Sequence, residues 1–346
     1  MGPYDAIARL ATVLTSGARM PRCRPEREGG LVRRDERQRV RVGGRDLDIS
    51  NLDKVLYAAS GTTKADVLRY YLEIADVLLP HLAGRAVTLR RYPDGVDGEA
   101  FYQKRCPDRR PPWIGTAQLG REGGRRPTHC VLAEPAALAW AANLAALELH
   151  VPLGSEPDPQ VPNAVVFDLD PGPPAGLLDT VTLALDLRRL FDRLGLAAVP
   201  KTSGGKGVQV YVPLNRSAVD YEQTRSFAGG LARLLERAHP DRVVATQTRA
   251  KRVGKVLVDW TQNHPTKTTV CVYSLRGGQR PTVSVPLRWE ELERAASARD
   301  VDALRFEPDA ALARVREHGD LFADVRRLSQ SLPDVAPSAG RRGPRC

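Results

Sequence analysis

Short apolar runs bounded by glycine and proline recur along this chain, and they predict strands. The clearest run covers residues 163–172, Asn-Ala-Val-Val-Phe-Asp-Leu-Asp-Pro-Gly, where an apolar strand is ended by Pro-Gly. Residues 198–213 predict a strand, a glycine loop and a second strand in which valines alternate with polar residues. Further strands are predicted over 86–92, 255–260 and 270–276.

Apolar residues at helical spacing separate these strands. One helix begins after Thr63, since Asp66 three residues later resembles a capping box, and its apolar positions continue to Leu82. Lys64 falls in the first turn of that helix, where backbone N–H groups favour an anion, although a solvated lysine is the simpler interpretation. Further helices are predicted over 180–194, over 221–238, from Trp289 onward, and over 135–149 as one helix or a helical pair.

The chain has 346 residues, enough for one large core or two modest ones, and its 42% hydrophobic and 27% charged residues are ordinary for a globular protein. No apolar run reaches the ~18 residues that a membrane span needs. The apolar stretch 5–18 is interrupted by Arg9 and follows no basic segment, so it does not resemble a signal peptide. We expect a cytoplasmic protein without a membrane partner.

The charge balance narrows the choice of partner, because 52 Lys and Arg against 41 Asp and Glu give a net charge of +11. Such a chain attracts a polyanion, nucleic acid or an anionic membrane, unless the arginines only reflect a GC-rich genome. Many arginines and few apolar residues in 19–45 predict a disordered basic arm over 1–38, which either binds nucleic acid or has no role. Folded sequence is predicted over 39–330 and a disordered basic tail over 331–346.

The cysteines do not form a recognisable framework. They are odd in number and scattered, with no Cys-x-x-Cys and no Cys/His cluster. Neither a structural zinc site nor a disulfide framework is therefore expected, which fits a reducing cytoplasm. The five are Cys23, Cys106, Cys130, Cys271 and Cys346.

Carboxylates mark the ends of two predicted strands. Asp168 and Asp170 lie two residues apart, so their side chains leave the strand on the same face. Two such carboxylates repel each other unless a cation lies between them, and oxygen ligands favour Mg²⁺ or Mn²⁺. Asp259, at the end of strand 255–260, adds a third. The alternative is a turn that happens to hold two aspartates.

Two further segments suit a phosphate-bearing ligand. In 203–207, Ser-Gly-Gly-Lys-Gly, glycines let backbone amides approach an anion and Lys206 adds charge, although a plain glycine hairpin is the alternative and the spacing is not that of a P-loop. Phe101 and Tyr102, followed by Lys104, suit a surface that stacks bases, although one ring can equally belong to the core.

Strand-borne aspartates, a Gly-Gly-Lys loop and flanking arginines together are typical of metal-dependent nucleotidyl transfer. Two divalent ions ~3.5–4 Å apart activate a 3′-hydroxyl and neutralise the leaving pyrophosphate, while Lys and Arg stabilise the triphosphate. None of the six histidines lies in a nucleophile or metal motif, and the Lys-x-Asp-Gly signature of ligases is absent.

Several motifs follow one another in a characteristic order. They are Asp53-Lys-Val-Leu-Tyr57, Leu89-Arg-Arg-Tyr-Pro-Asp-Gly-Val-Asp-Gly98, Phe101-Tyr-Gln-Lys104, Val166-Phe-Asp-Leu-Asp-Pro171, Lys201-Thr-Ser-Gly-Gly-Lys-Gly207, Val258-Asp-Trp-Thr-Gln-Asn263 and Tyr273-Ser-Leu-Arg276. From about Val40 to Phe322 the chain thereby resembles the polymerase domain of DNA ligase D, the bacterial ATP-dependent ligase that repairs double-strand breaks. That domain belongs to the archaeo-eukaryotic primase superfamily.

The resemblance implies an α+β fold, with a primase-like core whose mixed or antiparallel sheet is flanked by helices. It implies a DNA-templated, ribonucleotide-preferring polymerase, associated with the nucleoid, that uses two divalent ions (Mn²⁺ or Mg²⁺) to fill gaps and process broken ends. The implied catalytic and metal-binding residues are Asp168, Asp170 and Asp259. Those implied around the NTP or dNTP are Arg90, His150, Ser203, Gly204, Gly205, Lys206, Gln209, Arg249, Gln262 and Arg276. For the DNA they are Asn51, Lys54 and Lys64 at the 5′-phosphate, and Phe101, Tyr102 and Lys104 at the template.

The chain departs from the family pattern in two respects. Gln209 stands where the loop usually ends in His; it can donate a hydrogen bond to phosphate but carries no charge. No ligase or nuclease module is attached, so we expect a stand-alone polymerase that works with a separate ATP-dependent DNA ligase and with the Ku end-binding protein. The alternatives are a catalytically weak module that binds DNA ends through their 5′-phosphate, and a replicative-type primase.

Overall fold

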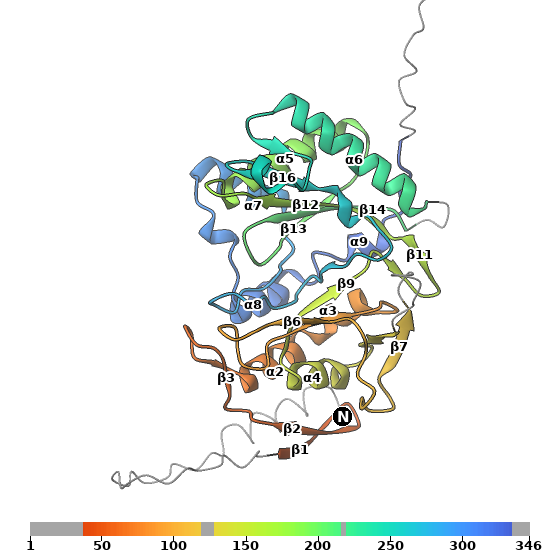
Figure 1. Ribbon diagram of the computed structural model, residues 1–346, viewed down its shortest axis with the longest axis vertical. Coiled ribbons are helices and arrows are strands. Elements are labelled where there is room, and N and C mark those ends of the chain that lie inside the picture. The colour runs from red at the N-terminus through yellow and green to blue at the C-terminus, as the bar shows by residue number, and fades with distance from the viewer. Residues whose placement is uncertain (1–36, 119–127, 216–218, 334–346) are drawn as a thin grey trace, which may run out of the picture.

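Strand β12 (Ala164–Pro171), the run singled out above, is the central strand of the larger sheet. The computed structural model describes residues 37–118, 128–215 and 219–333. Four strands join β12 in the order β13-β14-β12-β16-β15, with all pairs antiparallel except β15 and β16 (Figure 1). Their bounds are β13 (Val199–Thr202), β14 (Val208–Pro213), β15 (Val243–Val244) and β16 (Val256–Asp259).

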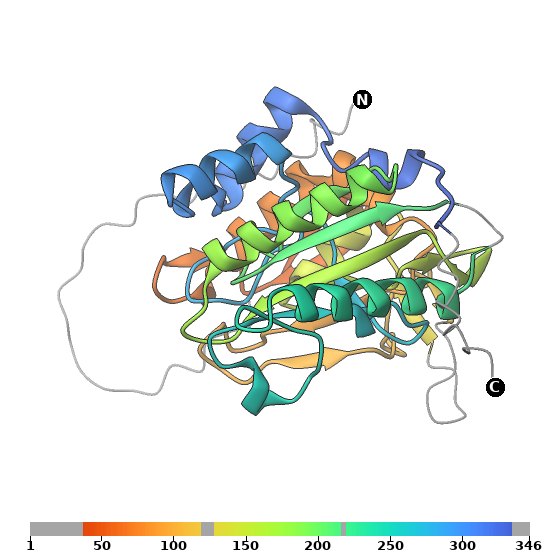
Figure 2. The same cartoon turned by 90° about the horizontal axis from the view of Figure 1, so that it is seen from above.

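Helices cover one face of this sheet because every second strand residue on that face is apolar. Val165, Phe167 and Leu169 of β12 are fully buried in a core shared with these helices. Figure 2 shows α5 and α6 running along the sheet. The helices are α5 (Leu177–Arg193), α6 (Tyr221–Ala238) and α7 (Trp289–Ala298), which packs on α5.

A second layer of the fold is built on a four-stranded sheet in the order β17-β9-β5-β6. Thr63 and Asp66 form the predicted capping box at the start of α2. This sheet and its helices share a second core, which includes Tyr211 from the face of the larger sheet opposite to α5 and α6. The elements are β5 (Thr88–Arg91), β6 (Phe101–Gln103), β9 (Ala146–Val151), β17 (Thr269–Val270), α2 (Lys64–Glu73), α3 (Ala75–Leu82) and α4 (Pro135–Asn143).

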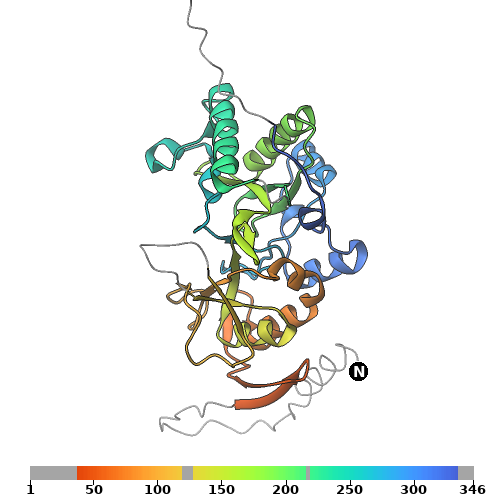
Figure 3. The same ribbon diagram turned by 90° about the vertical axis from the view of Figure 1, so that its right-hand side faces the viewer.

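Small hairpins and late helices complete the described part of the chain. The hairpin of β1 and β2 lies at the end of the molecule far from α6 (Figure 3). The remaining elements are β1 (Arg37–Val42), β2 (Arg45–Ser50), β3 (Val55–Tyr57), β4 (Thr62–Thr63), β7 (Gly115–Gln118), β8 (Thr128–Val131), β10 (Gly154–Ser155), β11 (Asp158–Pro162), η1 (Arg249–Arg252), η2 (Trp260–Gln262), η3 (Asp302–Leu304), α8 (Pro308–His318) and α9 (Asp324–Arg327). The α+β class, with a mixed sheet flanked by helices, is confirmed.

Two predicted elements are wrong. Residues 135–149 are not helical throughout, because α4 ends at Asn143 and β9 begins at Ala146, with Ala145 in a left-handed conformation between them. A continuous apolar run does not distinguish a buried helix from a buried strand. Residues 270–276 are mostly not a strand either. Beyond Val270 the backbone turns at Tyr273, whose φ is +63°, and pairs with the segment around Ser284.

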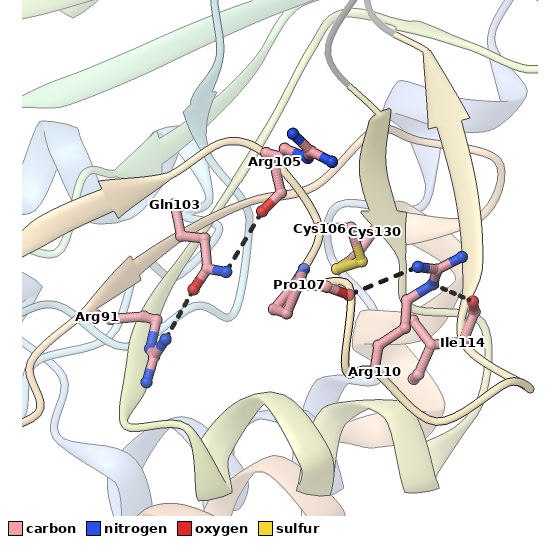
Figure 4. The surroundings of a disulfide bond; sticks show 8 residues. All are labelled: Arg91, Gln103, Arg105, Cys106, Pro107, Arg110, Ile114 and Cys130. Atoms are coloured by element: carbon pink, nitrogen blue, oxygen red, sulfur yellow. Dashed lines mark hydrogen bonds between the residues drawn. A yellow bond between two sulfur atoms is a disulfide. The ribbon is translucent and has the colours of Figure 1, made fainter.

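The sequence analysis expected no disulfide framework and missed one disulfide: Cys106 and Cys130 are bonded, with their Cα atoms 4.9 Å apart. Their 24-residue separation leaves no motif in the sequence. A backbone hydrogen bond from Cys106 N–H to Thr128 O brings the two segments together. The disulfide thereby ties the segment that follows β6 to strand β8 (Figure 4).

The predicted basic arm and tail lie largely outside the described residues. Within that part of the chain, residues 37 and 38 already belong to β1, so the predicted boundary at 38 falls inside a strand. Leu332 packs against the core of the larger sheet. No described helix is long and apolar enough to cross a membrane.

Candidate active site

A row of polar side chains crosses the face of the larger sheet opposite to helices α5 and α6, toward the second layer of the fold. Asp168 of β12 pairs with Gln209 on one side and with Asp259 on the other, and Gln209 pairs in turn with Lys201. Residues paired across antiparallel strands point to the same face, about 4.5–5.5 Å apart between Cα atoms. Asp170, two residues along β12, shares this face. The three strand-borne aspartates are therefore neighbours.

Negative charge is concentrated at Asp168. Burial, with the carboxylates of Asp259 and Asp170 nearby, raises the pKa of Asp168 to about 6, although a hydrogen bond from Gln209 and the charge of Lys201 oppose the rise. Lys201 is fully buried and donates a 2.6 Å hydrogen bond to Ser284 Oγ, and burial lowers its pKa to about 7. With a pKa of about 7, Lys201 is only partly protonated at neutral pH, so a further cation would stabilise the ionised form of Asp168.

The other two aspartates engage protein groups instead of a common centre. Arg252 forms an ion pair with Asp170, while Asp259 accepts hydrogen bonds from Thr261 and from Gln262 Nε2 at 2.9 Å. This is why no three His, Cys, Asp or Glu side chains gather as a preformed metal site among the described residues. The residues nevertheless fit a hard divalent ion, since three carboxylates share one face of the sheet. One of them, Asp170, already binds the positively charged guanidinium group of Arg252.

Glu148 of β9 is a residue that the sequence analysis missed, and it gathers three predicted nucleotide contacts. It is 1% exposed and accepts hydrogen bonds from Tyr92 at 2.6 Å and from the backbone N–H of Gly277 at 3.1 Å. Three cationic or ionisable side chains surround it: Arg90 at 3.0 Å, His150 at 2.9 Å and Arg276 at 3.3 Å. A glutamate inside a strongly apolar run was the available signal.

These contacts decide the protonation of the cluster. Burial alone would raise the pKa of Glu148, but His150 and Arg276 hold it well below its ordinary range. Burial lowers the pKa of His150 despite its hydrogen bond to Glu148. Glu148 is therefore ionised at neutral pH, and it holds the guanidinium groups of Arg90 and Arg276 in place.

The glycine loop between β13 and β14 lies beside this cluster. Gly204 has a φ of +70°, and a Cβ there would lie 2.6 Å from Cγ of Arg276, so the close approach requires glycine. Ser203 Oγ accepts 3.2 Å hydrogen bonds from the N–H groups of Gly205 and Gly207. Lys206, at the tip, is exposed. Arg276 thus joins the loop to Glu148.

Two predicted nucleotide contacts have other surroundings. Gln209 hydrogen-bonds the Asp168 carboxylate, and its buried Oε1 has no hydrogen-bond partner. Arg249 is exposed on η1, and it is Arg252 three residues later that contacts an aspartate of the row.

The predicted template surface lies on β6. Phe101 and Tyr102 are 42% and 54% exposed, which excludes a core position for either ring. Arg91 lies over the Phe101 ring and Arg90 over the Tyr102 ring, both at about 5 Å from the centroid. Arg90 therefore connects this aromatic pair to Glu148. Lys104 follows on the exposed segment that leads to the disulfide.

The predicted 5′-phosphate residues lie in one local structure. The N–H of Lys54 donates to Asn51 O and the N–H of Lys64, the first residue of α2, donates to Lys54 O, so the turn at 51–54 lies against the start of this helix. Lys64 is 5% exposed and donates a 2.7 Å hydrogen bond to Ser50 O. Lys54 forms a 3.1 Å ion pair with Asp94. Both ammonium groups therefore have protein partners here.

Joining a nucleotide to a DNA end requires carboxylates for divalent ions close to cations for a triphosphate, and this fold brings both together. That combination defines a metal-dependent nucleotidyltransferase of the DNA-directed polymerase type. The chain belongs to the family of LigD primase-polymerase domains, which it matches over residues 63–322.

Relatives of known structure or curated function agree with this assignment. The chain is 38% identical to the polymerase domain from Mycobacterium tuberculosis Ligase D in complex with DNA, with a TM-score of 0.75 over 82% of this chain and 99% of that one. It is 41% identical to the multifunctional non-homologous end joining protein LigD of Mycolicibacterium smegmatis and 36% identical to the bifunctional LigD of Bacillus subtilis. These alignments cover 80% and 83% of this chain but only 36% and 45% of those proteins.

Proposed function

We propose that this protein fills gaps and extends broken DNA ends during double-strand break repair, adding ribonucleotides in preference to deoxyribonucleotides. The observation that carries the proposal is the pairing of Asp168 with Asp259 beside the cluster around Glu148. Two relatives are named as non-homologous end joining proteins, and the similar solved domain is bound to DNA. The proposal includes a location at the nucleoid and cooperation with a DNA ligase and with Ku.

In this mechanism each group of residues has a separate task. Asp168, Asp170 and Asp259 would hold two divalent ions, Mn²⁺ or Mg²⁺, which lower the pKa of the primer 3′-hydroxyl and neutralise charge on the departing pyrophosphate. Asp170 would exchange Arg252 for an ion, and Asp259 would turn away from Gln262.

Residues of the Glu148 cluster and of the glycine loop would orient the nucleotide. Lys206, Arg276 and His150 would bind the triphosphate. Ser203 would hold the loop in shape through the N–H groups of Gly205 and Gly207, so that Lys206 at its tip reaches the phosphates. Phe101 and Tyr102 would pack on template bases. Gln209 would position the Asp168 carboxylate through the hydrogen bond already present.

Primer extension on a gapped duplex with a 5′-phosphate, with Mn²⁺ and each nucleotide type in turn, tests the proposal. We expect template-directed addition, faster with ribonucleotides. Binding without addition would instead identify a module that binds DNA ends. Synthesis on a template without a primer would identify a replicative-type primase.

The 5′-phosphate assignment predicts that Lys54→Ala and Lys64→Ala each weaken binding to phosphorylated gaps by about ten-fold or more, since charge-assisted hydrogen bonds contribute about 1.5–3 kcal/mol. The preference for phosphate over hydroxyl ends, measured by fluorescence anisotropy on paired substrates, should largely disappear. Asp94→Asn is the converse variant: it releases Lys54 from its ion pair and should raise the preference. Unchanged preference in both lysine variants would place the phosphate site elsewhere.

A further inference from the structure

A pocket lined by two arginines lies beside the turn η2, which directly follows Asp259 at the end of β16. Helix α6 and the turn η2 enclose it, with a volume of about 560 Å³. Arg225 and Arg233 of α6 line it, together with Trp260 and His264. None of these four residues belongs to the groups discussed above.

The packing of Trp260 determines the shape of the pocket. A Cβ at Gly229 of α6 would lie 3.2 Å from the indole ring, so the ring packs directly on the helix. The indole N–H also donates a 2.9 Å hydrogen bond to Ala245 O. A glycine inside a helix lowers its stability by about 1 kcal/mol relative to alanine. At Gly229 this loss is offset because the indole of Trp260 can pack closely on the helix.

The indole holds two arginines in place. Arg225 and Arg233 lie four residues before and after Gly229, with guanidinium carbons 5.4 and 5.9 Å from the ring centroid. Both side chains are exposed, and neither forms an ion pair within the described part of the chain. Glu222 is the acidic residue in the lining. Two guanidinium groups thus pack against the same indole ring, and among the described residues neither is in an ion pair with a carboxylate.

We propose that this pocket binds phosphodiester groups of single-stranded DNA that passes the active site. Guanidinium groups bind phosphate through paired N–H donors. The indole already packs against Gly229 and both guanidinium groups, which favours contact with the DNA backbone over stacking on a base. This inference rests on the proposed function.

The position of the pocket relates it to catalysis. Trp260 directly follows Asp259, and Gln262 of the same turn hydrogen-bonds the Asp259 carboxylate. Single-stranded DNA bound at Arg225 and Arg233 would therefore lie next to the turn η2, whose first residue directly follows Asp259. The pocket would thus be a binding site for unpaired DNA that is separate from the template surface of β6.

The test is anisotropy titration of gapped duplexes with short and long single-stranded gaps over a salt series. We expect Arg225→Ala/Arg233→Ala to lower affinity for the long gap by about ten-fold or more, through two charged hydrogen-bonding groups. The slope of log K against log salt should become shallower by about 1.4, since each phosphate contact on a single strand contributes about 0.7. Binding to the short gap should change much less. Arg193→Ala, an exposed arginine on α5, is the matched control and should change neither quantity.

Phosphate could also come from a free nucleotide, so ATP binding is measured by calorimetry on the same variants. In the alanine variant, weaker ATP binding with unchanged DNA binding would overturn the inference, as would an unchanged salt slope or an equal loss of affinity for both gaps. Should the alanine variant unfold, Arg225→Lys/Arg233→Lys answers the same question. Lysine keeps the charge but lacks the planar fork, so the slope should persist while affinity for the long gap falls. Primer extension by the wild type tests the proposed function independently.

Discussion

Asp168→Asn should lower the rate of nucleotide addition by a factor on the order of a thousand or more. Under the proposed metal assignment, the ions that Asp168 would hold supply several kcal/mol of charge stabilisation, and each 1.4 kcal/mol is worth about ten-fold in rate. Primer extension under single-turnover conditions measures the loss. DNA affinity should stay within a few-fold, because Asp168 does not contact the basic groups assigned to DNA.

A second measurement separates loss of metal from loss of fold. Mn²⁺ at about 100 times its Kd should stabilise the wild type by about 2.7 kcal/mol, and should not stabilise the Asn variant to this extent. Asp158→Asn, an exposed aspartate on β11, serves as the control and should behave as the wild type. Near-normal extension by Asp168→Asn would remove the metal assignment.

The same variant has a defined pH signature without metal. The pKa of Asp168 is raised from 3.8 to about 6 in the folded protein, so folding favours its protonated form. The wild type should therefore lose stability as pH rises from about 4 to above 6. Asp168→Asn should lack this contribution, which comparison of the two denaturation curves across that range tests.

Glu148→Gln should destabilise the protein by about 3–5 kcal/mol, because it leaves Arg90 and Arg276 without their buried counter-ion. The KM for the nucleotide should rise as well, since both guanidinium groups lose the carboxylate that orients them. Denaturant unfolding and steady-state kinetics measure the two effects. Glu156→Gln, an exposed glutamate, is the control and should change neither.

The pH dependence of this difference identifies its source. The pKa of Glu148 lies well below its ordinary 4.5 in the folded protein, so its stabilisation is complete above that pH and is lost as pH falls further. The stability gap between wild type and Glu148→Gln should be constant from pH 7 to about 5 and then narrow. A stability difference that stays constant below pH 5 would exclude the ionised carboxylate of Glu148 as its cause.

Local patterns were sufficient for much of the fold. The bounds predicted for the helix over 221–238 are those of α6, and the strand within 163–172 is β12, because amphipathic periodicity and Pro-Gly ends are properties of a few adjacent residues. The same reasoning failed at 135–149, where α4 gives way to β9. Both elements are buried on all sides there, so periodicity carries no information.

For the site, the sequence by itself determined that Asp168 and Asp170 share a face, since alternation along a strand is local. Only the tertiary structure decided that Asp259 lies opposite Asp168, that Glu148 gathers Arg90 and Arg276, and that Cys106 meets Cys130. Each of these contacts joins segments distant along the chain. Their pairing is set by sheet register and by the burial of two separate cores, which no short stretch of sequence contains.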